Sequence, residues 1–316
     1  MPSSSHKVVW VGLFANIAIA ACKYVAGALT RSPAMMSEAF HSTADVGNEL
    51  LLLLGMRRSR RPPDALHPFG HGKLLYFYSL LVAVYIFGVG GGLAFYEGIR
   101  YLRHPEPSTH LLWSYCVLAL AAVLDFYSWL ISYRELLARK DPNESTWDEI
   151  VGSKDPSVFT VFLEDSAGLI GLALAFLGIF LGQIFHNVYF DPVASLLIGL
   201  LLTGLALLLG RETGALLTGE RTNRSRLKQI REILLSDPAV ERIGDLLSMQ
   251  LGADQVLINV KIKFDASLSL AQIESHIARL KRRIQQPDSS AIQIFIEPSH
   301  LDEKSHGTAQ RPSTAA

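Results

Sequence analysis

Residues 37–56, SEAFHSTADVGNELLLLLGM, place a polar run at the start of an apolar run that is typical of a membrane helix. His41 and Asp45 are four residues apart, so on a helix they lie one turn apart on the same face. An imidazole nitrogen and a carboxylate oxygen at this spacing can bind one cation and supply half of a tetrahedral zinc shell. Ionisable groups inside an apolar helix usually mark ion or proton pathways. We therefore expect His41 and Asp45 to bind a metal, and the alternative is a hydrogen-bonded pair that tightens helix packing.

A second acidic pair lies in the later apolar segment DPSVFTVFLEDSAGLIGLALAFLGIFLG. Glu164 and Asp165 are adjacent and so point about 100° apart on a helix. Asp165 is the first candidate ligand, and the longer Glu164 could reach the same ion from the side or serve a proton route. The alternative is a pair of charges placed favourably at a helix start. The predicted intramembrane site comprises His41, Asp45, Glu164 and Asp165, a donor set that favours zinc, then manganese or iron.

The composition of the chain is that of a membrane protein. Hydrophobic residues make up 49% of the 316 positions and charged residues 18%, which is too apolar for an average soluble domain. The 29 Lys and Arg balance the 29 Asp and Glu, so nothing favours nucleic-acid binding. The two cysteines, Cys22 and Cys116, lie in apolar runs and predict neither a disulfide framework nor a thiolate zinc site.

Six segments have the roughly 20 apolar residues that a membrane helix needs. They are expected at residues 8–29, 34–56, 74–102, 111–138, 157–183 and 190–213. Basic residues concentrate after the second and fourth spans, so the positive-inside rule places both termini on the cytoplasmic side. The first segment is interpreted as a retained helix rather than a signal peptide, and the absence of an Arg-rich transit segment favours a bacterial inner membrane.

The pattern changes after residue 215. Residues 223–236 and the segment SLAQIESHIARLKRRIQ have a helical period, and Ser267 or Ser269 is a plausible cap of the second helix. VERIGDLLSMQLG, QVLINVKIKFD and AIQIFIEP read as strands. The order α-β-β-α-β predicts a small, ferredoxin-like α+β domain. We expect a six-helix transmembrane domain at 1–215, a cytoplasmic domain at 216–298 and a disordered tail at 299–316.

Together these motifs resemble the cation diffusion facilitator family. The resemblance covers roughly residues 8–298 and rests on SPAMMSEAFHSTADVGNELLLLLG, HPFGHGK, FDPVASLLIGLLL and LLTGE. LLWSYCVLA, DPSVFTVFLEDSAGLIG and HPFGHGKLLYFYSLL make the chain similar to the zinc transporter nine branch. The resemblance implies a secondary active transporter, a homodimer that exports a divalent cation from the cytoplasm in exchange for protons. Zn²⁺ is the first expectation, with Mn²⁺ or Fe²⁺ as alternatives.

The resemblance also assigns ligands. The second-span pair and Asp165 match the family's metal ligands, but the histidine that the family commonly has one turn before Asp165 is Val161 here. The usual fourth ligand is therefore missing. Glu164 is the expected substitute, and water or Glu38 are the fallbacks.

Asp64, His67 and His71 match loop residues that bind a second, cytoplasmic ion in some bacterial relatives. Two imidazoles and a carboxylate are donors that zinc accepts. The alternative is a loop that caps helices and hydrogen-bonds the domain interface. In the C-terminal domain, Phe295 stands where the family often has a histidine and His276 is isolated on its predicted helix, so no metal site is expected in this domain. His276 is interpreted as an ordinary surface or interface residue.

Proton coupling is expected to involve His41 and Asp125. Metal binding requires neutral imidazole and ionised carboxylates, so it competes with protons, and imidazole titrates near neutral pH. Asp125 lies in the middle of the fourth span, where the zinc transporter nine branch carries an acidic group. An ion pair between Asp125 and Lys23 of the first span is an equal alternative, because charges inside a membrane tend to pair.

Two other function classes compete with transport. A membrane metalloprotease would need a motif such as H-E-x-x-H, which the sequence lacks, so no enzyme activity and no prosthetic group are expected. A metal sensor or scaffold would use the bundle only as an anchor. An anchor has no need for buried ionisable side chains, which favours the transporter.

Overall fold

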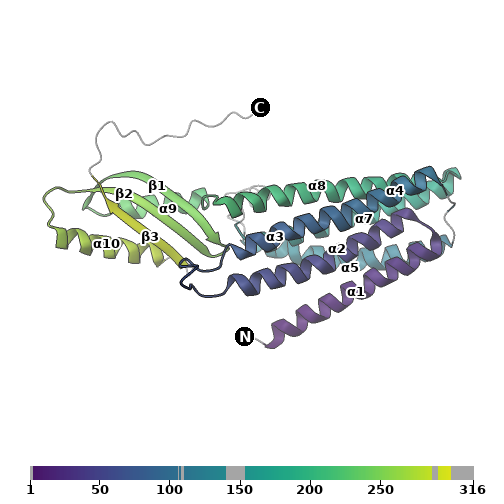
Figure 1. Ribbon diagram of the computed structural model, residues 1–316, viewed down its shortest axis with the longest axis horizontal. Helices are drawn as coiled ribbons and strands as arrows, with labels where there is room; N and C mark the ends of the chain where they lie inside the picture. The colour runs from purple at the N-terminus through teal and green to yellow at the C-terminus, as the bar shows by residue number, and fades with distance from the viewer. Residues whose placement is uncertain (1–2, 106, 108–109, 140–153, 287–290, 300–316) are drawn as a thin grey trace, which may run out of the picture.

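A bundle of long helices forms one part of the structure, and a small sheet domain lies at one end of it (Figure 1). The computed structural model describes residues 3–105, 107, 110–139, 154–286 and 291–299. The bundle helices are α1 (Ser3–Thr30), α2 (Pro33–Ser59), α3 (Leu74–Tyr85), α4 (Leu93–Arg103), α5 (Leu111–Arg139), α7 (Pro156–Phe185) and α8 (Phe190–Thr218). Because α3 continues into α4 through the π-helix η1 (Ile86–Gly92), these helices match the six predicted spans, with ends that differ by a few residues.

Four helical segments are long and apolar enough, by length and composition, to cross a membrane. Within the described residues these segments are Leu74–Arg103, Leu111–Arg134, Phe159–Phe185 and Phe190–Thr218, and α1 has a shorter apolar stretch at Asn16–Thr30. The α2 helix is less apolar than these four segments, because its first half contains the polar run. However, α2 contacts α1, α3, α4, α7 and α8, and Glu38, His41 and Asn48 are buried. Its polar side chains therefore face other helices rather than lipid.

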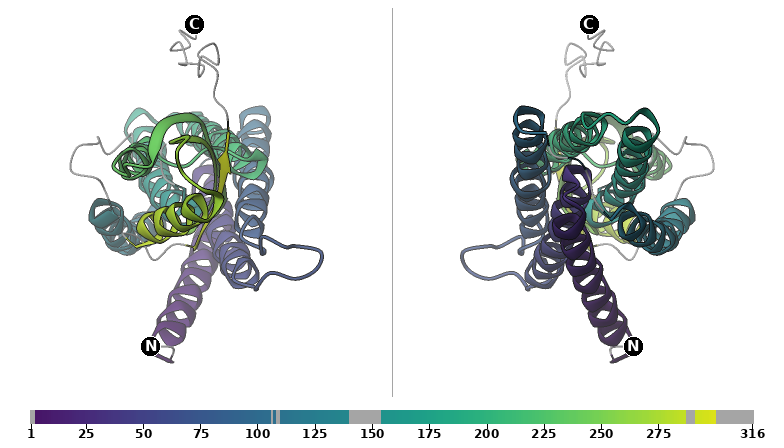
Figure 2. Two further views of the ribbon diagram at one scale, coloured as in Figure 1. Left: turned by 90° about the vertical axis from the view of Figure 1, so that its left-hand side faces the viewer. Right: turned by 90° about the vertical axis from the view of Figure 1, so that its right-hand side faces the viewer.

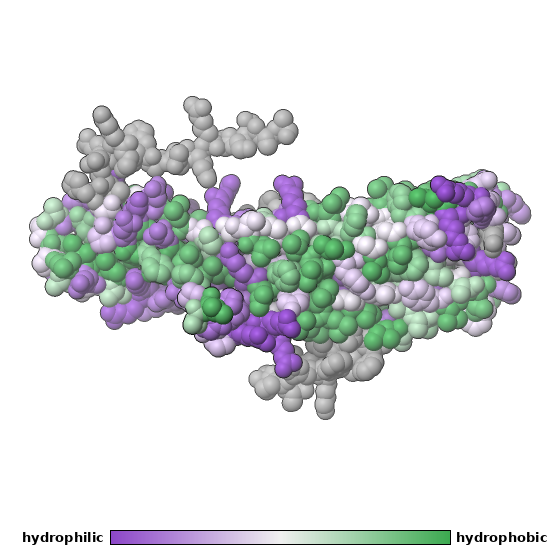
Figure 3. All heavy atoms as spheres, in the orientation of Figure 1, coloured by the Kyte–Doolittle hydropathy of each residue, from purple (hydrophilic) through white to green (hydrophobic). Residues whose placement is uncertain are grey.

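The outer surface of the bundle is suited to lipid. Hydrophobic residues cover much of its middle on the face drawn in Figure 3, and hydrophilic residues gather at its far end and beside the sheet domain. Several large apolar side chains of α5 are exposed: Leu112, Trp113, Leu120, Val123, Phe126 and Ile131. The first turns of α1 lean away from the other helices, on the same side of the bundle as the sheet domain (Figures 1 and 2).

Hydrogen bonds between α2 and α8 fasten the end of the bundle that is remote from the sheet domain. Asp191 Oδ1 accepts hydrogen bonds from Ser32 Oγ and from the backbone nitrogen of Ala34, both at 3.0 Å. One turn further on, Ser37 Oγ and Ser195 Oγ are 2.6 Å apart. A carboxylate on the first backbone N–H groups of a helix satisfies donors that have no partner within the helix. The aspartate of the motif FDPVAS thus caps a different helix from its own.

The π-helix η1 interrupts the third span where the sequence reads IFGVGGG. Side chains are minimal here because α8 passes close by. A Cβ atom on Gly91 would lie 2.7 Å from Thr203 Oγ1 and 3.2 Å from the carbonyl oxygen of Gly199. The apolar pattern alone predicted one continuous helix, so the change of helical type is a feature that the sequence analysis missed.

The C-terminal domain has the predicted order α9 (Arg224–Leu235), β1 (Val240–Gly252), β2 (Gln255–Phe264), α10 (Leu270–Gln285) and β3 (Ala291–Pro298). The strand order is β1-β2-β3, with β1 antiparallel and β3 parallel to β2. Buried side chains of β2 form a core with apolar residues of α9 and α10: Val256, Ile258, Val260, Ile262, Ile230, Leu234, Leu280 and Ile284. Both helices therefore cover one face of the sheet. Of the predicted tail, residues 300–316 lie outside the described part of the chain.

Ser269 is the cap of α10, which decides between the two serines that the sequence offered. The Gln272 side chain accepts a hydrogen bond from the Ser269 backbone nitrogen at 2.8 Å, which completes a capping box. Ser267 instead donates its backbone N–H and its hydroxyl to Asp265 in the preceding turn.

The sheet domain and the bundle meet at a polar junction. The backbone nitrogen of Gln250 donates to the carbonyl oxygen of Glu220 at 2.8 Å, and the Glu220 side chain forms a 2.8 Å ion pair with Lys154. A Cβ atom on Gly72 would lie 2.6 Å from Gln255 Oε1, so the loop after α2 packs directly on the β1–β2 turn. The connection between the second and third spans thus touches the C-terminal domain.

His276 is a structural residue rather than the isolated one that we expected. Its Nδ1 lies 2.9 Å from Oδ1 of Asp237, whose side chain is fully buried. Arg279 donates to both oxygen atoms of the same carboxylate: Nε lies 3.1 Å and Nη2 2.7 Å from Oδ2, and Nη2 lies 3.0 Å from Oδ1. Burial by itself raises the pKa of Asp237, but hydrogen bonds from Arg279, Ala239 and His276 outweigh it and bring the pKa below its ordinary value. The cluster ties α10 to the corner between α9 and β1.

We expect Asp237→Asn to destabilise the C-terminal domain by about 2 to 4 kcal/mol, since the change leaves Arg279 without a buried anionic partner. Because the folded-state pKa lies below the unfolded one, the carboxylate stabilises the fold at neutral pH. That contribution is lost as the pH falls from about 4 through the folded value. Hydrogen exchange of α10 in the full-length protein measures both effects. Asp245→Asn, at an exposed position of β1, is the control and should leave exchange unchanged.

Candidate functional site

His41 and Asp45 of α2 lie together inside the bundle. His41 is 3% exposed, and its Nδ1 is 3.4 Å from Oδ1 of Asp45. That buried oxygen has no hydrogen-bond partner among the described residues. A Cβ atom on Gly168 of α7 would lie 2.8 Å from Nε2 of His41. The imidazole is thus in contact with α7, the helix that carries the second acidic pair, and a cation could satisfy the unpaired oxygen.

Glu164 and Asp165 point to different helices, as their adjacent positions predict. Glu164 is 8% exposed and accepts a 2.9 Å hydrogen bond from Nδ2 of Asn48 on α2. Asp165 accepts hydrogen bonds from two serines of α5, at 3.2 Å from Ser128 and 2.8 Å from Ser132. Glu164 therefore lies on the α2 side of α7, where His41 and Asp45 are, and Asp165 lies on the α5 side.

The four predicted ligands do not converge on a single point in this conformation. The oxygen atoms of Asp165 are engaged by α5, and Glu164 is held by Asn48. Asp45 is nevertheless within electrostatic range of both Glu164 and Asp165. Three neighbouring carboxylates in a low-dielectric interior repel each other strongly. A divalent cation or added protons would relieve that repulsion, which is the electrostatic basis for competition between metal and protons.

Asp125 and Glu38 both pair with the buried Lys23 of α1. Lys23 Nζ lies 3.1 Å from Oε2 of Glu38 and 3.7 Å from Oδ2 of Asp125. The ion pair that we considered for Asp125 is therefore present. Glu38, a fallback ligand in the sequence analysis, is committed to the lysine in this structure.

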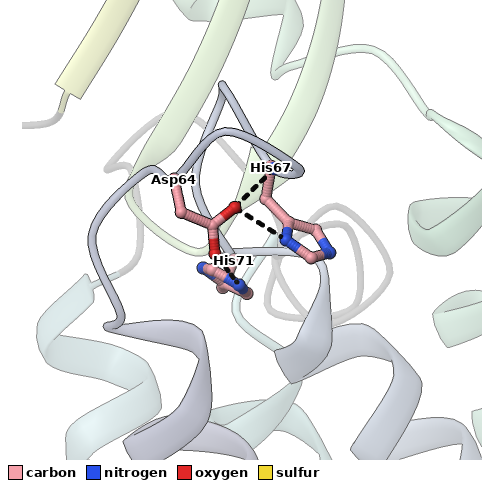
Figure 4. Close-up of side chains that lie close together, drawn as sticks. All are labelled: Asp64, His67 and His71. Carbon is pink, nitrogen blue, oxygen red and sulfur yellow. Dashed lines mark hydrogen bonds and ion pairs between the residues drawn. The ribbon is translucent and has the colours of Figure 1, made fainter.

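Asp64, His67 and His71 form a cluster in the loop between α2 and α3 (Figure 4). Each residue offers a ligand atom, and these atoms lie within 4.8 Å of one another, which no other group of three within the described ranges matches. Asp64 Oδ1 is 3.1 Å from His67 Nδ1, Asp64 Oδ2 is 3.5 Å from His71 Nε2, and the two rings are 4.3 Å apart. The loop thus assembles a set of donors of the type that zinc takes.

Hydrogen bonds around this loop cluster fix how its side chains are held. The backbone N–H of His67 donates to Asp64 Oδ1 at 2.6 Å. This bond is the largest cause that lowers the pKa of Asp64 below its ordinary value, so the carboxylate is ionised at neutral pH. His71 Nδ1 lies 3.2 Å from the carbonyl oxygen of Pro62, a bond in which Nδ1–H donates and Nε2 stays free to accept a metal.

A comparison with protein families decides the identity. The profile described as the cation efflux transmembrane domain matches residues 9–218, which is well over half of the chain.

The chain belongs to the cation efflux family.

Relatives of this cation efflux protein include zinc and manganese transporters. The mouse protein named proton-coupled zinc antiporter SLC30A9, mitochondrial, is 36% identical over 261 residues, which make up 82% of this chain and 46% of the relative. The human protein of the same name is 35% identical over 261 residues. The manganese efflux system protein MneP of Bacillus subtilis is 22% identical over 299 residues, covering 92% of this chain and 95% of the relative. The chain spans about half the length of the mammalian relatives.

These findings confirm several expectations. The cation efflux protein is an integral, multi-pass membrane protein whose family members are transporters rather than enzymes. The predicted family and its similarity to the zinc transporter nine branch are confirmed by the profile and by the mammalian relatives.

The structure adds residues that the sequence analysis did not assign. Asn48 lies in the polar run of residues 37–56 but was not singled out, and its side chain donates a hydrogen bond to Glu164. Ser128 and Ser132 of α5 were not considered, although their four-residue spacing puts both hydroxyls on one helix face. Val161, at the position of the usual histidine, packs against the apolar core of the bundle.

Proposed function

We propose that this cation efflux protein exchanges Zn²⁺ for protons across its membrane through a site formed by His41, Asp45, Glu164 and Asp165. The observation that carries the proposal is the buried His41 beside Asp45, whose buried Oδ1 is unpaired among the described residues, against the helix that bears both other acids. Buried unpaired polar atoms are costly, so their retention at the centre of the bundle indicates a ligand.

The exchange follows from the chemistry of the ligands. A metal ion binds when the imidazole is neutral and the carboxylates are ionised, and protons that reach the same groups from the opposite side displace it. For the ion to be enclosed by all four ligands, α7 must turn or shift so that Asp165 leaves Ser128 and Ser132. Rocking of one part of the bundle against the other would open the site to each side in turn. His41 within the site and Asp125 beside Lys23 are the groups that we propose for proton coupling.

Manganese is the second candidate substrate. Val161 replaces a nitrogen donor of the usual zinc set and leaves a site rich in carboxylates, which suit manganese better than imidazole does. The name of the Bacillus subtilis relative assigns manganese efflux to that protein. Fe²⁺ and a metal sensor without transport remain the other outcomes of the test.

Flux measurements on purified protein in liposomes test the proposal. Vesicles containing a zinc-sensitive dye and a pH dye should report zinc entry with proton movement in the opposite direction. The same assay with manganese and iron ranks the ions. A folded protein that moves none of these ions would replace the antiporter with the sensor.

The loop cluster is proposed as a second, cytoplasmic metal site. Asp64→Ala is expected to reduce the number of zinc ions bound per chain by one and to leave zinc transport measurable, because the loop lies outside the spans. Equilibrium dialysis with metal analysis counts the ions. Exposed Asp254, in the β1–β2 turn, supplies the matched control Asp254→Ala. If Asp64→Ala binds as many ions as the wild type, the loop is a structural contact with the C-terminal domain.

The uncovered face of the sheet is the proposed homodimer contact. Leu247 of β1 pairs with Asn259 of β2, which pairs with Phe295 of β3, so the three lie in one row across the sheet. Leu247 is 62% exposed and Phe295 is 50% exposed. Leu247→Asp is expected to shift the protein from dimer to monomer in multi-angle light scattering. The control is Asp245→Ala, a change at an exposed position of the same strand. The Asp245→Ala protein should remain a dimer.

The two chain ends are proposed to face the compartment that supplies the metal, since the start of α1 and the sheet domain lie at the same end of the bundle. The names of the mammalian relatives assign those proteins to mitochondria, so they do not support the expected bacterial inner membrane.

A further inference from the structure

A lysine is enclosed in the centre of the bundle, next to the proposed transport site. Lys23 is 0% exposed and pairs with carboxylates of two other helices, Glu38 of α2 at 3.1 Å and Asp125 of α5 at 3.7 Å. Glu38 is also 0% exposed, and its second oxygen, Oε1, packs against Gly171 of α7 and has no hydrogen-bond partner in the described part of the chain. This network joins four helices at one point.

The stability of the bundle does not explain this arrangement. Removing two charges from water costs several kcal/mol per ion, and a buried ion pair often stabilises a protein no more than apolar side chains of the same size. Here the energetic cost of burial is offset less than usual, because one carboxylate oxygen of Glu38 has no hydrogen-bond partner among the described residues. A lysine that is retained inside the bundle at such a cost is expected to serve the function of the protein.

Five acidic side chains around the lysine fall into two groups. Glu38 and Asp125 are neutralised by the ammonium, whereas Asp45, Glu164 and Asp165 have no lysine or arginine bound to them among the described residues. Glu38 is one turn from His41 on the same face of α2, so without Lys23 it would be a further ligand for an ion at His41. The ammonium is also within electrostatic range of Asp45 and His41.

We propose that Lys23 is a built-in counter-cation of the transport site. Its ammonium holds Glu38 and Asp125 out of the coordination of the ion, and it lowers the affinity of the site for a divalent cation so that the ion can leave again. A metal held by five carboxylates in a dry interior would be released too slowly for transport. The inference rests on the proposed function, because it assigns the release step of the same site.

Zinc affinity of purified, full-length protein at about pH 8, well above the ordinary pKa of carboxyl groups, tests the charge of Lys23. Lys23→Met is expected to tighten zinc binding about tenfold or more, since a buried unit charge near the ion is removed. Zinc turnover in liposomes should fall at the same time. Lys23→Arg keeps the charge and should stay within about threefold of the wild type. Cys22→Ala, the exposed neighbour in the chain, is the matched control.

Asp125→Asn is expected to change zinc affinity in the opposite direction to Lys23→Met. It frees the ammonium from one partner and should weaken zinc binding, whereas the double variant Lys23→Met/Asp125→Asn should return to within about threefold of the wild-type affinity. A purely structural role predicts instead that both single variants weaken binding together.

Each result bears on a separate claim. Unchanged or weakened binding by Lys23→Met overturns the inference, and so does unchanged binding by Asp125→Asn if Lys23→Met does not fold. Wild-type protein that neither binds nor moves zinc overturns the proposed function. Wild-type protein that does both, with affinities that ignore the charge at position 23, overturns only the role of Lys23.

Discussion

Liposomes that contain Asp45→Ala or His41→Ala protein should show no zinc entry and no zinc-driven proton movement. His41 Nδ1 and Asp45 Oδ1 lie 3.4 Å apart, and in the proposed site each side chain supplies a different type of donor to one ion. Loss of either side chain removes one of the two ligands that α2 is proposed to supply. We expect zinc affinity to fall by at least about 100-fold, more than the loss that follows when only an outer-shell partner of a metal ligand is removed.

The isosteric change Asp45→Asn separates charge from shape. Asparagine fills the same space and retains an oxygen atom that can bind a metal. However, it lacks the negative charge that would attract the cation, and it cannot take up a proton in place of the cation. It should therefore be as inactive as Asp45→Ala, with a thermal stability equal to or above that of the wild type, because a buried charge is removed. Leu50→Ala, on the exposed face of the same helix, controls for general damage to α2. Zinc flux by a well-folded Asp45→Asn protein would place the ion elsewhere.

Glu164→Gln is expected to have the second-largest effect and to exceed Asp165→Asn. The structure directs Glu164 toward α2, where it binds Asn48, while Asp165 is held by Ser128 and Ser132 on α5. Glutamine can still accept the hydrogen bond from Asn48, so helix packing is preserved and only the charge is lost. Zinc affinity should fall about 100-fold for Glu164→Gln and about tenfold for Asp165→Asn.

Zinc titrations of both variants, beside the paired change Ser128→Ala/Ser132→Ala, test this order. Removing the two hydroxyls frees Asp165 to approach the ion and should tighten zinc binding or leave it unchanged. If Asp165→Asn loses more zinc affinity and Glu164→Gln binds zinc as tightly as the wild type, the ion is held on the α5 side of α7. The missing histidine at Val161 would then be replaced by water rather than by Glu164.

Much of the architecture was predictable because apolar length and periodicity are local properties of the chain. The segments around residues 74–102, 111–138, 157–183 and 190–213 became membrane helices, since about 20 apolar residues cannot be buried otherwise. Strict alternation in QVLINVKIKF predicted the central strand, whose alternate residues are the buried core of the domain. The one-turn spacing that brings His41 and Asp45 together is likewise a property of a single helix.

Choices between partners were decided by the tertiary structure. The sequence could not show whether Asp125 pairs with Lys23, and the fold brings Lys23 Nζ of α1 to 3.7 Å from Oδ2 of Asp125. His276 looked isolated in the sequence because its partner, Asp237, is distant along the chain and is brought close only when α10 packs beside the α9–β1 corner.

The spans, the order of elements in the C-terminal domain and the donor types available to a metal could all be read from the sequence, since each depends on residues that are close together in the chain. The contact of Glu164 with α2, of Asp165 with the serines of α5 and of Glu38 with Lys23 became visible only once the helices were packed together. The helical period gives the direction in which each side chain points, but its contact partner depends on which helix packs on that side.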